Sequence, residues 1–464
     1  MSMFGMRGGR STRAAAASVA VLALVAAACG STSPGSTSST SAAAGTGSTA
    51  ASSSSASSSP SSTSSNGAPS GTTLDIANFL PFSGADAAFG PLGLSGCYPA
   101  VSLINAAGGA MGHHFKCTSM DSRGDPVDAV PAMNKMLANS KNIAVVFGPS
   151  SDTVLSTASL LEQGKMPFFT MSGNVHFLDN TSPYFWRLTP PDNYEGYAMA
   201  VWAHKKGYTR AAAVFATGTT AQSNGPASIK GFKNLGGKIV ANLKLTPGQG
   251  SYRTEVSQLL AAKPQVIFYT APASTSATFF AEMKQLGTIP PVIVTEVAEE
   301  PKWTSAVGGS IGRSTLHSQF TAMEASTDTN TPGYPTFKKA LLSSNPHVPN
   351  VAKYVSDPFT ITYYDAANLT ALAMIASKSS DRTVYNPWIL KLTKPSPGAV
   401  IVHDFAVGKK ALKQGKTIQY VGAEGKIVIN SHHNASGAFK AVTMSTNPKK
   451  IGEATKQELA AAAK

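Results

Sequence analysis

Small polar residues and glycines follow three segments that have the pattern of short buried strands. Residues 81–84 and Phe89 follow the segment 74–79, residues 148–153 follow 143–147, and residues 172–174 follow 167–170. In open parallel sheets, ligands bind beyond the carboxyl ends of the strands. Hydroxyl groups and unpaired backbone N–H groups at helix N-termini attract a carboxylate or another anion. The three loops therefore predict a site for a small polar ligand, although Ser150, Ser151 and Asp152 would also serve as simple helix caps.

The sequence gives little support for an enzyme or a metal site. It lacks the HExxH run, the phosphate-binding P-loop pattern and a GxGxxG run after a strand. Two histidine pairs, His113–His114 and His432–His433, have neighbouring side chains that point to opposite faces on a strand, so one metal ion would rarely take both. We therefore predict no catalytic residues, no metal and no cofactor.

Apolar segments alternate regularly with helical patterns from about residue 74 onward. The predicted strands are 74–79, 115–120, 143–147, 167–170, 211–215, 239–243, 266–269 and 292–295. Apolar residues recur at helical spacing over 94–104, 127–137, 154–161, 194–201, 226–235, 252–262 and 276–286. Such alternation predicts parallel sheets covered by helices on both faces.

The pair Pro190–Pro191 divides this alternation into two runs. We predict an α/β fold with two doubly wound parallel-sheet lobes joined by a hinge. The expected lobes are 74–190 with 317–425 and 191–316 with 426–445, followed by a C-terminal tail at 446–464. A TIM barrel has a similar rhythm and is the alternative.

The N-terminus predicts export. Basic residues precede an apolar run over 14–28, which is too short for a transmembrane helix and has the pattern of a cleavable signal peptide at 1–28. Residues 26–29 resemble a bacterial lipobox, which implies lipidation of Cys29. Residues 29–73 are rich in Ser, Thr, Ala and Gly and predict a flexible tether. The alternative is ordinary secretion, with Cys29 incidental.

Charge and cysteines constrain the partners of the folded part. The formal net charge is +14, but Lys and Arg are scattered, and export makes nucleic acid an improbable partner. Cys97 and Cys117 lie 20 residues apart, and an oxidising compartment favours a disulfide between them over two buried thiols.

Several motifs together resemble the type 1 periplasmic binding proteins of ABC transporters, in particular the branched-chain amino acid branch. The similarity covers about 74–443. The motifs are Ser83-Gly84 with Phe89-Gly90, residues 104–109, Asp121 with Asp125-Pro126, residues 148–151, 167–172, 364–366 and 422–425.

The resemblance implies a ligand held between two lobes that close by a hinge. It implies that serine-bearing loops of the first lobe grip a carboxylate, that an acidic residue of the second lobe takes an ammonium group, and that Phe89 covers the ligand. The implied ligand-binding residues are Ser83, Phe89, Ser150, Ser151, Ser172, Gly173, Asn174, Asn224 and Glu296. Asn224 stands where the family usually has a tyrosine, and residues 271–274 lack the usual aromatic. These departures indicate a ligand other than leucine, such as an amide, a short peptide or a polyamine-like molecule.

We therefore expect an exported, lipid-anchored, monomeric solute-binding protein that delivers an amino acid-like ligand to the membrane permease of an ABC importer. The alternatives are a sensory lipoprotein of the same fold, which reports ligand to a membrane receptor, and an exported enzyme.

Overall fold

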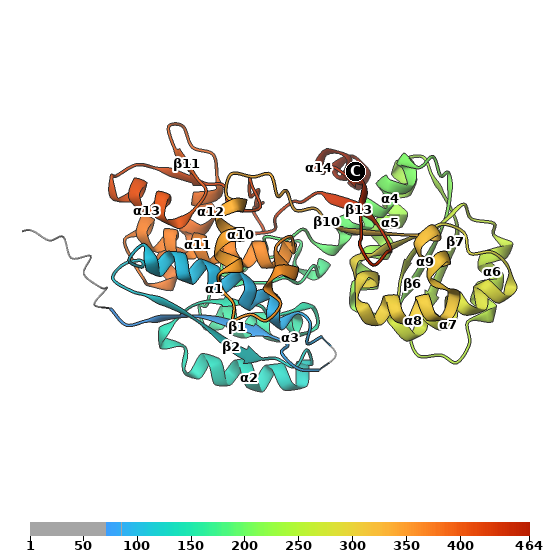
Figure 1. Ribbon diagram of the computed structural model, residues 1–464, viewed down its shortest axis with the longest axis horizontal. Coiled ribbons are helices and arrows are strands. Elements are labelled where there is room, and N and C mark those ends of the chain that lie inside the picture. Colours follow the sequence, from blue (N-terminus) through green and yellow to red (C-terminus); the bar gives the residue numbers. More distant parts are fainter. Residues whose placement is uncertain (1–70, 85) are drawn as a thin grey trace, which may run out of the picture. The chain divides into compact units, whose positions relative to one another are not determined.

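The computed structural model describes residues 71–84 and 86–464, with the backbone alone for residues 151, 152, 219 and 220 (Figure 1). The predicted signal peptide, the lipidation site Cys29 and the predicted tether up to residue 70 lie outside the described residues.

Five parallel strands form the first sheet, in the order β2-β1-β3-β4-β5. The strands are β1 (Leu74–Leu80), β2 (Phe115–Asp121), β3 (Ile143–Phe147), β4 (Phe168–Phe169) and β5 (Phe185–Trp186). The apolar run of β3 is buried along its whole length, as expected for a strand covered on both faces.

Helices cover both faces of the first sheet. On one face, Ile76 and Val145 pack in a core with α1 (Gly90–Ala106), α10 (Tyr334–Leu342), α11 (Pro358–Ser377), α12 (Arg382–Thr393) and α13 (Phe405–Lys413). On the other face, Phe79 and Val146 pack with α2 (Pro126–Ala138) and α3 (Ser151–Gln163). A two-stranded parallel sheet, β11 (Val400–Val402) with β12 (Ile418–Tyr420), accompanies the first group.

Seven strands form the second sheet, in the order β14-β13-β10-β9-β8-β6-β7. The strands are β6 (Arg210–Ala216), β7 (Lys238–Leu245), β8 (Val266–Thr270), β9 (Val292–Thr295), β10 (Phe320–Ala325), β13 (Phe439–Thr443) and β14 (Lys450–Ala454). Its helices are α4 (Asp192–Lys205), α5 (Thr219–Asn234), α6 (Arg253–Ala261), α7 (Ala273–Leu286), α8 (Pro301–Ile311), α9 (Arg313–Gln319) and α14 (Lys456–Ala463). β6 to β10 pair in parallel, whereas β13 and β14 add an antiparallel edge. The two open sheets exclude the TIM barrel.

Two segments lie in the second sheet although the sequence pattern placed them elsewhere. β10 falls within 317–425, which we expected in the first lobe, yet it pairs with β9 and β13. The C-terminal segment 446–464 contains β14 and α14. α14 begins with a capping box, in which the Thr455 side chain accepts from the Glu458 N–H and the Glu458 side chain accepts from the Thr455 N–H. Leu459 and Ala462 of α14 are buried in the core of the second sheet.

Three chain segments connect the two sheets, and backbone hydrogen bonds hold them side by side. The Arg187 N–H donates to the His433 carbonyl (3.0 Å), and the Ala435 N–H donates to the Arg187 carbonyl (2.8 Å). The Ser326 N–H of the third segment donates to the Ala438 carbonyl (2.8 Å). Each lobe is therefore built from more than one segment of the chain.

A disulfide joins Cys97 of α1 to Cys117 of β2, with the two Cα atoms 6.1 Å apart, which confirms the predicted pairing. It fixes the first helix against the edge strand of the first sheet, next to the core that covers β1.

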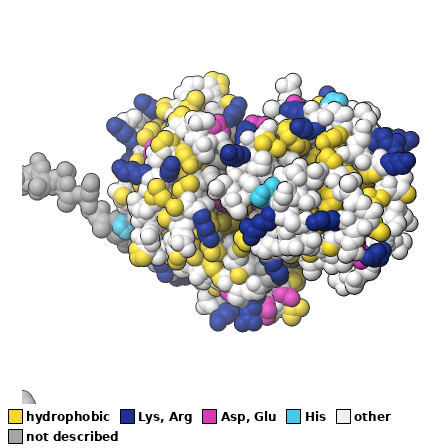
Figure 2. All heavy atoms as spheres, turned by 45° about the vertical axis from the view of Figure 1, so that its right-hand side comes forward, with side chains coloured by type: hydrophobic (Ala, Val, Ile, Leu, Met, Phe, Trp, Pro, Cys, Tyr) yellow, Lys and Arg dark blue, Asp and Glu magenta, His cyan; other side chains and the backbone are white. Residues whose placement is uncertain are grey.

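Lys and Arg side chains are scattered in small groups over the face shown in Figure 2, among polar and apolar side chains. Over the described residues, no helix is both long and apolar enough to cross a membrane.

Candidate functional site

The loops that follow β3 and β4 are tied together at the carboxyl edge of the first sheet. The Thr170 hydroxyl donates to the Pro149 carbonyl (2.7 Å) and accepts from the Ser172 N–H (2.9 Å). The Ser172 hydroxyl in turn accepts from the Asn174 N–H (3.3 Å). The loops therefore form one hydrogen-bonded unit, as expected for neighbouring parallel strands.

Ser150 stands at the N-terminus of α3, as the sequence predicts. Its side chain is buried, makes no capping hydrogen bond, and its hydroxyl has no partner among the described residues. Simple helix capping does not account for this hydroxyl. The neighbouring prediction, Ser151, has a side chain outside the described part of the structure.

Ser83 and Phe89 make structural contacts within the first lobe. The Ser83 hydroxyl donates to Asp121 (2.5 Å), and the Phe82 N–H donates to the same carboxylate (2.8 Å). Burial opposes ionisation of Asp121, but these hydrogen bonds lower the pKa of its carboxyl below the ordinary value. Phe89 is partly buried against the core beside α1.

The Arg187 side chain donates hydrogen bonds to the backbone of the loop at 172–174. Its side chain is fully buried, and one terminal nitrogen donates to the carbonyls of Ser172 (3.0 Å) and Asn174 (2.9 Å). Nε donates to the Asn434 side chain (2.8 Å), while Nη2 has no partner within the described structure. Burial lowers the Arg187 pKa to about 10, and the nearby charge of Asp192 acts in the opposite direction.

Asp192 begins α4 directly after Pro191 and faces Gly173. The Asp192 N–H donates to the Gly173 carbonyl (2.8 Å), and a Cβ atom at position 173 would collide with the Asp192 carboxylate. Burial raises the Asp192 pKa to about 6, against the opposing effect of Arg187. Glycine at 173 is therefore required by this close approach between the first sheet and α4.

Glu195, one turn further along α4, links α4 with β9 and α5. Its carboxylate accepts from the Glu296 N–H (2.8 Å) and from the Asn224 side-chain amide (2.6 Å). Asn224 is fully buried, and its Oδ1 has no partner among the residues described. Burial, followed by the charge of Glu296, raises the Glu195 pKa well above its ordinary value.

Glu296 follows β9 directly, at the start of a short 3-10 helix, Glu296–Glu299. It is partly buried, and burial followed by the charges of Asp192 and Glu324 raises its pKa to about 8. Glu299 has a pKa of about 9 because of burial and its contact with Glu324. The structure thus gathers carboxyl groups that the sequence pattern could not place together.

A small cavity brings residues from both sheets together. Its volume is about 20 Å³, which is room for about one water molecule. The cavity is lined by Met171, Gly173, Thr189, Pro190, Asp192, Glu195, Glu296, Ala325, Phe359 and Phe439. Its charged lining is entirely acidic, and two phenylalanines complete the wall.

Of the eight expected ligand-binding residues that the structure describes in full, only Gly173 and Glu296 line this cavity. Ser172 and Asn174 flank Gly173, and their carbonyls accept hydrogen bonds from Arg187. The Asn224 side chain donates to the Glu195 carboxylate. Ser83 and Phe89 are outside the lining.

Sequence reasoning missed several lining or supporting residues, namely Asp192, Glu195, Arg187, Phe359 and Phe439. Asp192 and Glu195 sit in the first turn of a predicted helix, where acidic residues are common for reasons of helix dipole alone. Their one available signal was their position just after the proline pair that divides the two runs.

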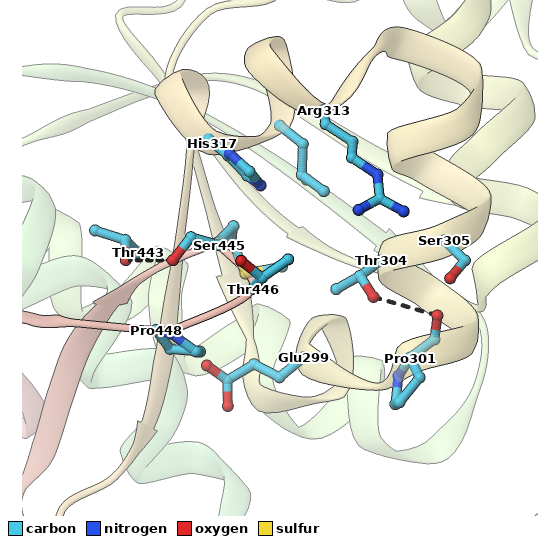
Figure 3. Close-up of a pocket in the computed structure, with 12 residues that line it drawn as sticks. Glu299, Pro301, Thr304, Ser305, Arg313, His317, Thr443, Ser445, Thr446 and Pro448 are labelled. Atoms are coloured by element: carbon cyan, nitrogen blue, oxygen red, sulfur yellow. Dashed lines mark hydrogen bonds between the residues drawn. The ribbon is translucent and has the colours of Figure 1, made fainter.

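A larger cavity of about 310 Å³ lies wholly in the second lobe, between α8, α9 and the turn from β13 to β14 (Figure 3). Arg313 and His317 point into it from α9, opposite Glu299. Two pairs of groups at this cavity are hydrogen-bonded, namely Thr443 with Ser445 (3.3 Å) and Thr304 with the Glu300 carbonyl (3.2 Å), whereas Oε1 of Glu299 has no partner among the described residues. All of its lining residues belong to the second lobe, so the strand-end loops of the first lobe do not contribute to this cavity.

The remaining chemical motifs are used structurally. His432 and His433 hydrogen-bond to the carbonyls of Asn180 (3.0 Å) and Phe185 (2.9 Å). Gly308, Ser310 and Gly312 have GxSxG spacing, but Ser310 lies inside α8 and not at the strand-to-helix turn that a nucleophilic serine of this motif occupies. Its hydroxyl donates to the Val307 carbonyl (2.9 Å). Among the described residues, no group of three His, Cys, Asp or Glu side chains could hold a metal ion.

Comparisons with known proteins agree with this architecture. A family profile described as periplasmic binding protein matches residues 73–445. A curated relative named amino acid binding protein, from Pseudomonas aeruginosa, is 26% identical over 213 residues, which is 45% of this chain. The match spans 56% of that relative's length.

Solved structures share the fold at low sequence identity. A leucine binding protein, LivK, from Thermotoga maritima has a TM-score of 0.64 and 18% identity, covering 83% of this chain and 100% of its own. LivJ from Streptococcus pneumoniae, in complex with isoleucine, has a TM-score of 0.61 and 17% identity, covering 82% and 99%. A solute binding protein from R. palustris, in complex with benzoate, has a TM-score of 0.60 and 15% identity, covering 82% and 96%.

Proposed function

Because this chain belongs to the periplasmic binding protein family, we propose that it is the extracytoplasmic solute-binding component of an ABC importer and captures a small polar ligand between its two lobes. The observation that carries the proposal is the cavity to which the strand-end residues Gly173 and Glu296 both contribute, one from each sheet. Family and fold are those of binding proteins rather than enzymes.

The ligand-binding groups divide into two sets. Ser150 and the loop 172–174 offer a hydroxyl and amide groups from the first lobe, and the Asn174 side-chain nitrogen has no partner in the described structure. Glu296 and Asp192 offer carboxylates from the second lobe. A ligand with a polar acceptor group at one end and an ammonium or amide N–H at the other would satisfy both sets, as an amino acid, an amino acid amide or a short peptide does.

Binding requires the lobes to move. A cavity of about 20 Å³ is too small for an amino acid. The three connecting segments form the hinge about which the lobes separate, admit the ligand and close over it. The closed form is then the form that the membrane permease recognises.

A lipid anchor at Cys29 would keep the protein on the outer side of the cytoplasmic membrane. Cleavage before Cys29 and lipidation of that cysteine would anchor the folded lobes to the cytoplasmic membrane through the Ser-rich tether, with the protein acting as a monomer. Metabolic labelling with a radioactive fatty acid would test the anchor, and Cys29→Ala should abolish the label.

A thermal-shift screen tests the binding function. The purified full chain is titrated with amino acids, amides, short peptides and polyamines. A true ligand at 100 times its Kd should raise the free energy of unfolding by about 2.7 kcal/mol. Small-angle scattering should then show a smaller radius of gyration with ligand. Failure of every solute to shift the melting temperature would contradict the proposal.

A further inference from the structure

The charged groups of the interlobe cavity contrast with the chain as a whole. The chain has 38 Lys and Arg against 24 Asp and Glu. Yet Asp192, Glu195 and Glu296 line the cavity, and none of its lining residues is Lys, Arg or His. The ionisable side chains that line this cavity of a basic protein are thus all carboxyl groups.

The surrounding elements do not neutralise these carboxyl groups. Further acidic residues interact with them from the segment after β9, from β10 and from the N-terminus of α11, namely Glu299, Glu300, Glu324 and Asp357. The cations facing this group are Arg187, which acts on Asp192, Lys440, which pairs with Glu324 at 2.7 Å, and Lys302, which acts on Glu300. Arg187 acts on Asp192, whereas the charged groups that act most strongly on Glu296 are all acidic. Glu296 therefore faces the cavity without a cation of its own.

Two independent features also suit a cation. Thr189 lines the cavity and is buried, and its hydroxyl has no partner among the described residues, so its oxygen can accept an N–H group. Phe359 and Phe439 line the same cavity, and aromatic faces attract ammonium and guanidinium groups.

We propose that the ligand of this cleft carries a net positive charge, as a diamine, a cationic amino acid or an amino acid amide does. The inference rests on the proposed binding function and goes beyond it, because a neutral zwitterion supplies one ammonium group and adds a carboxylate. A cationic ligand would place positive charge beside Asp192, Glu195 and Glu296, where the cavity lining contains no Lys, Arg or His side chain.

The proposal has a pH signature. Before binding, the raised pKa of Glu296, about 8, keeps a proton on this carboxyl group at neutral pH, whereas Asp192, with a pKa of about 6, becomes protonated as the pH falls through 6. A bound cation favours the ionised carboxylates, so binding releases protons. Aliphatic amines stay charged until about pH 10. Affinity for a diamine should therefore rise between pH 6 and pH 9.

Calorimetry on the full chain tests the inference with four probes: putrescine, L-lysine, L-leucine and L-glutamate. The expected result is that the cations bind about tenfold or more tightly than leucine, with proton release measured in buffers of different ionisation enthalpy. Tighter or equal binding of leucine or glutamate would overturn the inference and leave the proposed binding function intact. Absence of binding by any probe, together with a negative thermal-shift screen, would overturn both.

Matched variants separate charge from folding. Glu296→Gln should weaken putrescine binding about tenfold or more and reduce its pH dependence, with an unchanged melting temperature at pH 5. Glu162→Gln is the control, since Glu162 is an exposed residue near the far end of α3, and it should change neither property. Equal putrescine affinity in the wild type and in Glu296→Gln would contradict the proposal.

Discussion

Glu195 accepts a hydrogen bond from the backbone N–H of Glu296 at 2.8 Å, so a buried carboxylate in the first turn of α4 fixes the residue that follows β9. The other oxygen of Glu195 accepts from Asn224, and three elements of the second lobe meet at one carboxylate.

Glu195→Ala should therefore destabilise the second lobe. Alanine offers no acceptor, so the Glu296 N–H and the Asn224 amide would both lose their partner. We expect the free energy of unfolding to fall by about 1–3 kcal/mol, measured by urea denaturation at pH 7. An unchanged midpoint would show that this carboxylate is not a structural link.

Stability without ligand should depend on pH through Glu296. Its pKa in the folded protein, about 8, lies above its ordinary value of 4.5, so the folded state holds the proton more tightly than the unfolded state. The resulting stabilisation is complete below about pH 4.5 and is lost as the pH rises through 8. Glu296→Gln should flatten the fall in melting temperature between these values, whereas an identical pH profile in wild type and variant would refute this assignment.

Removal of the disulfide should destabilise the first lobe. Cys97 and Cys117 are 20 residues apart, and a cross-link of that size is worth about 3 kcal/mol in the chain-entropy model. The double variant Cys97→Ala, Cys117→Ala should lose about this free energy of unfolding. Wild-type protein treated with a reductant should show a similar loss, and a reductant should have no effect on the double variant.

Loss of Arg187 should release the loop at 172–174. Arg187→Met leaves the carbonyls of Ser172 and Asn174 and the Asn434 side chain without their donor. We expect a loss of about 3 kcal/mol or more in the free energy of unfolding. Arg187→Lys keeps the charge but not the geometry of the three hydrogen bonds. Its free energy of unfolding should therefore lie between those of the wild type and Arg187→Met.

The capping box predicts that α14 is a stable part of the second lobe. Thr455→Ala removes the acceptor for the Glu458 N–H and should lower the free energy of unfolding by about 1 kcal/mol. Thr455→Ser keeps the hydroxyl and should cost much less. If α14 were an exposed tail, both variants would unfold at the wild-type urea concentration.

The strands with continuous apolar runs could be predicted from the sequence because burial on both faces leaves a strong local signal. The segment 143–147 is the strand β3, and 292–295 is the strand β9, each with the expected bounds. β10 mixes Thr and Glu with apolar residues, so its local pattern is weak. It belongs to the second sheet because it pairs with β9, and a local sequence pattern does not reveal such pairing. α14 is rich in Ala, and its contacts with α4 and α5 make it part of the core.

The site was predictable where it depends on strand ends and unpredictable where it depends on burial. Glu296 directly follows β9, and Gly173 lies four residues after the end of β4, so the position of each relative to the sheet edge could be inferred. Arg187 is buried beside Asn434, which lies 247 positions away, and Glu195 meets Glu296, which lies 101 positions away. Single residues of this kind look like ordinary surface charges in the sequence.

The three connecting segments behave mechanically as a ribbon, because Arg187 is bonded to His433 and Ala435, and Ser326 is bonded to Ala438. A ribbon of hydrogen-bonded strands bends across its face far more easily than it shears along its length. The proposed motion between the lobes would thereby be restricted to a rotation about one axis, so that the same two faces would meet each time the lobes close.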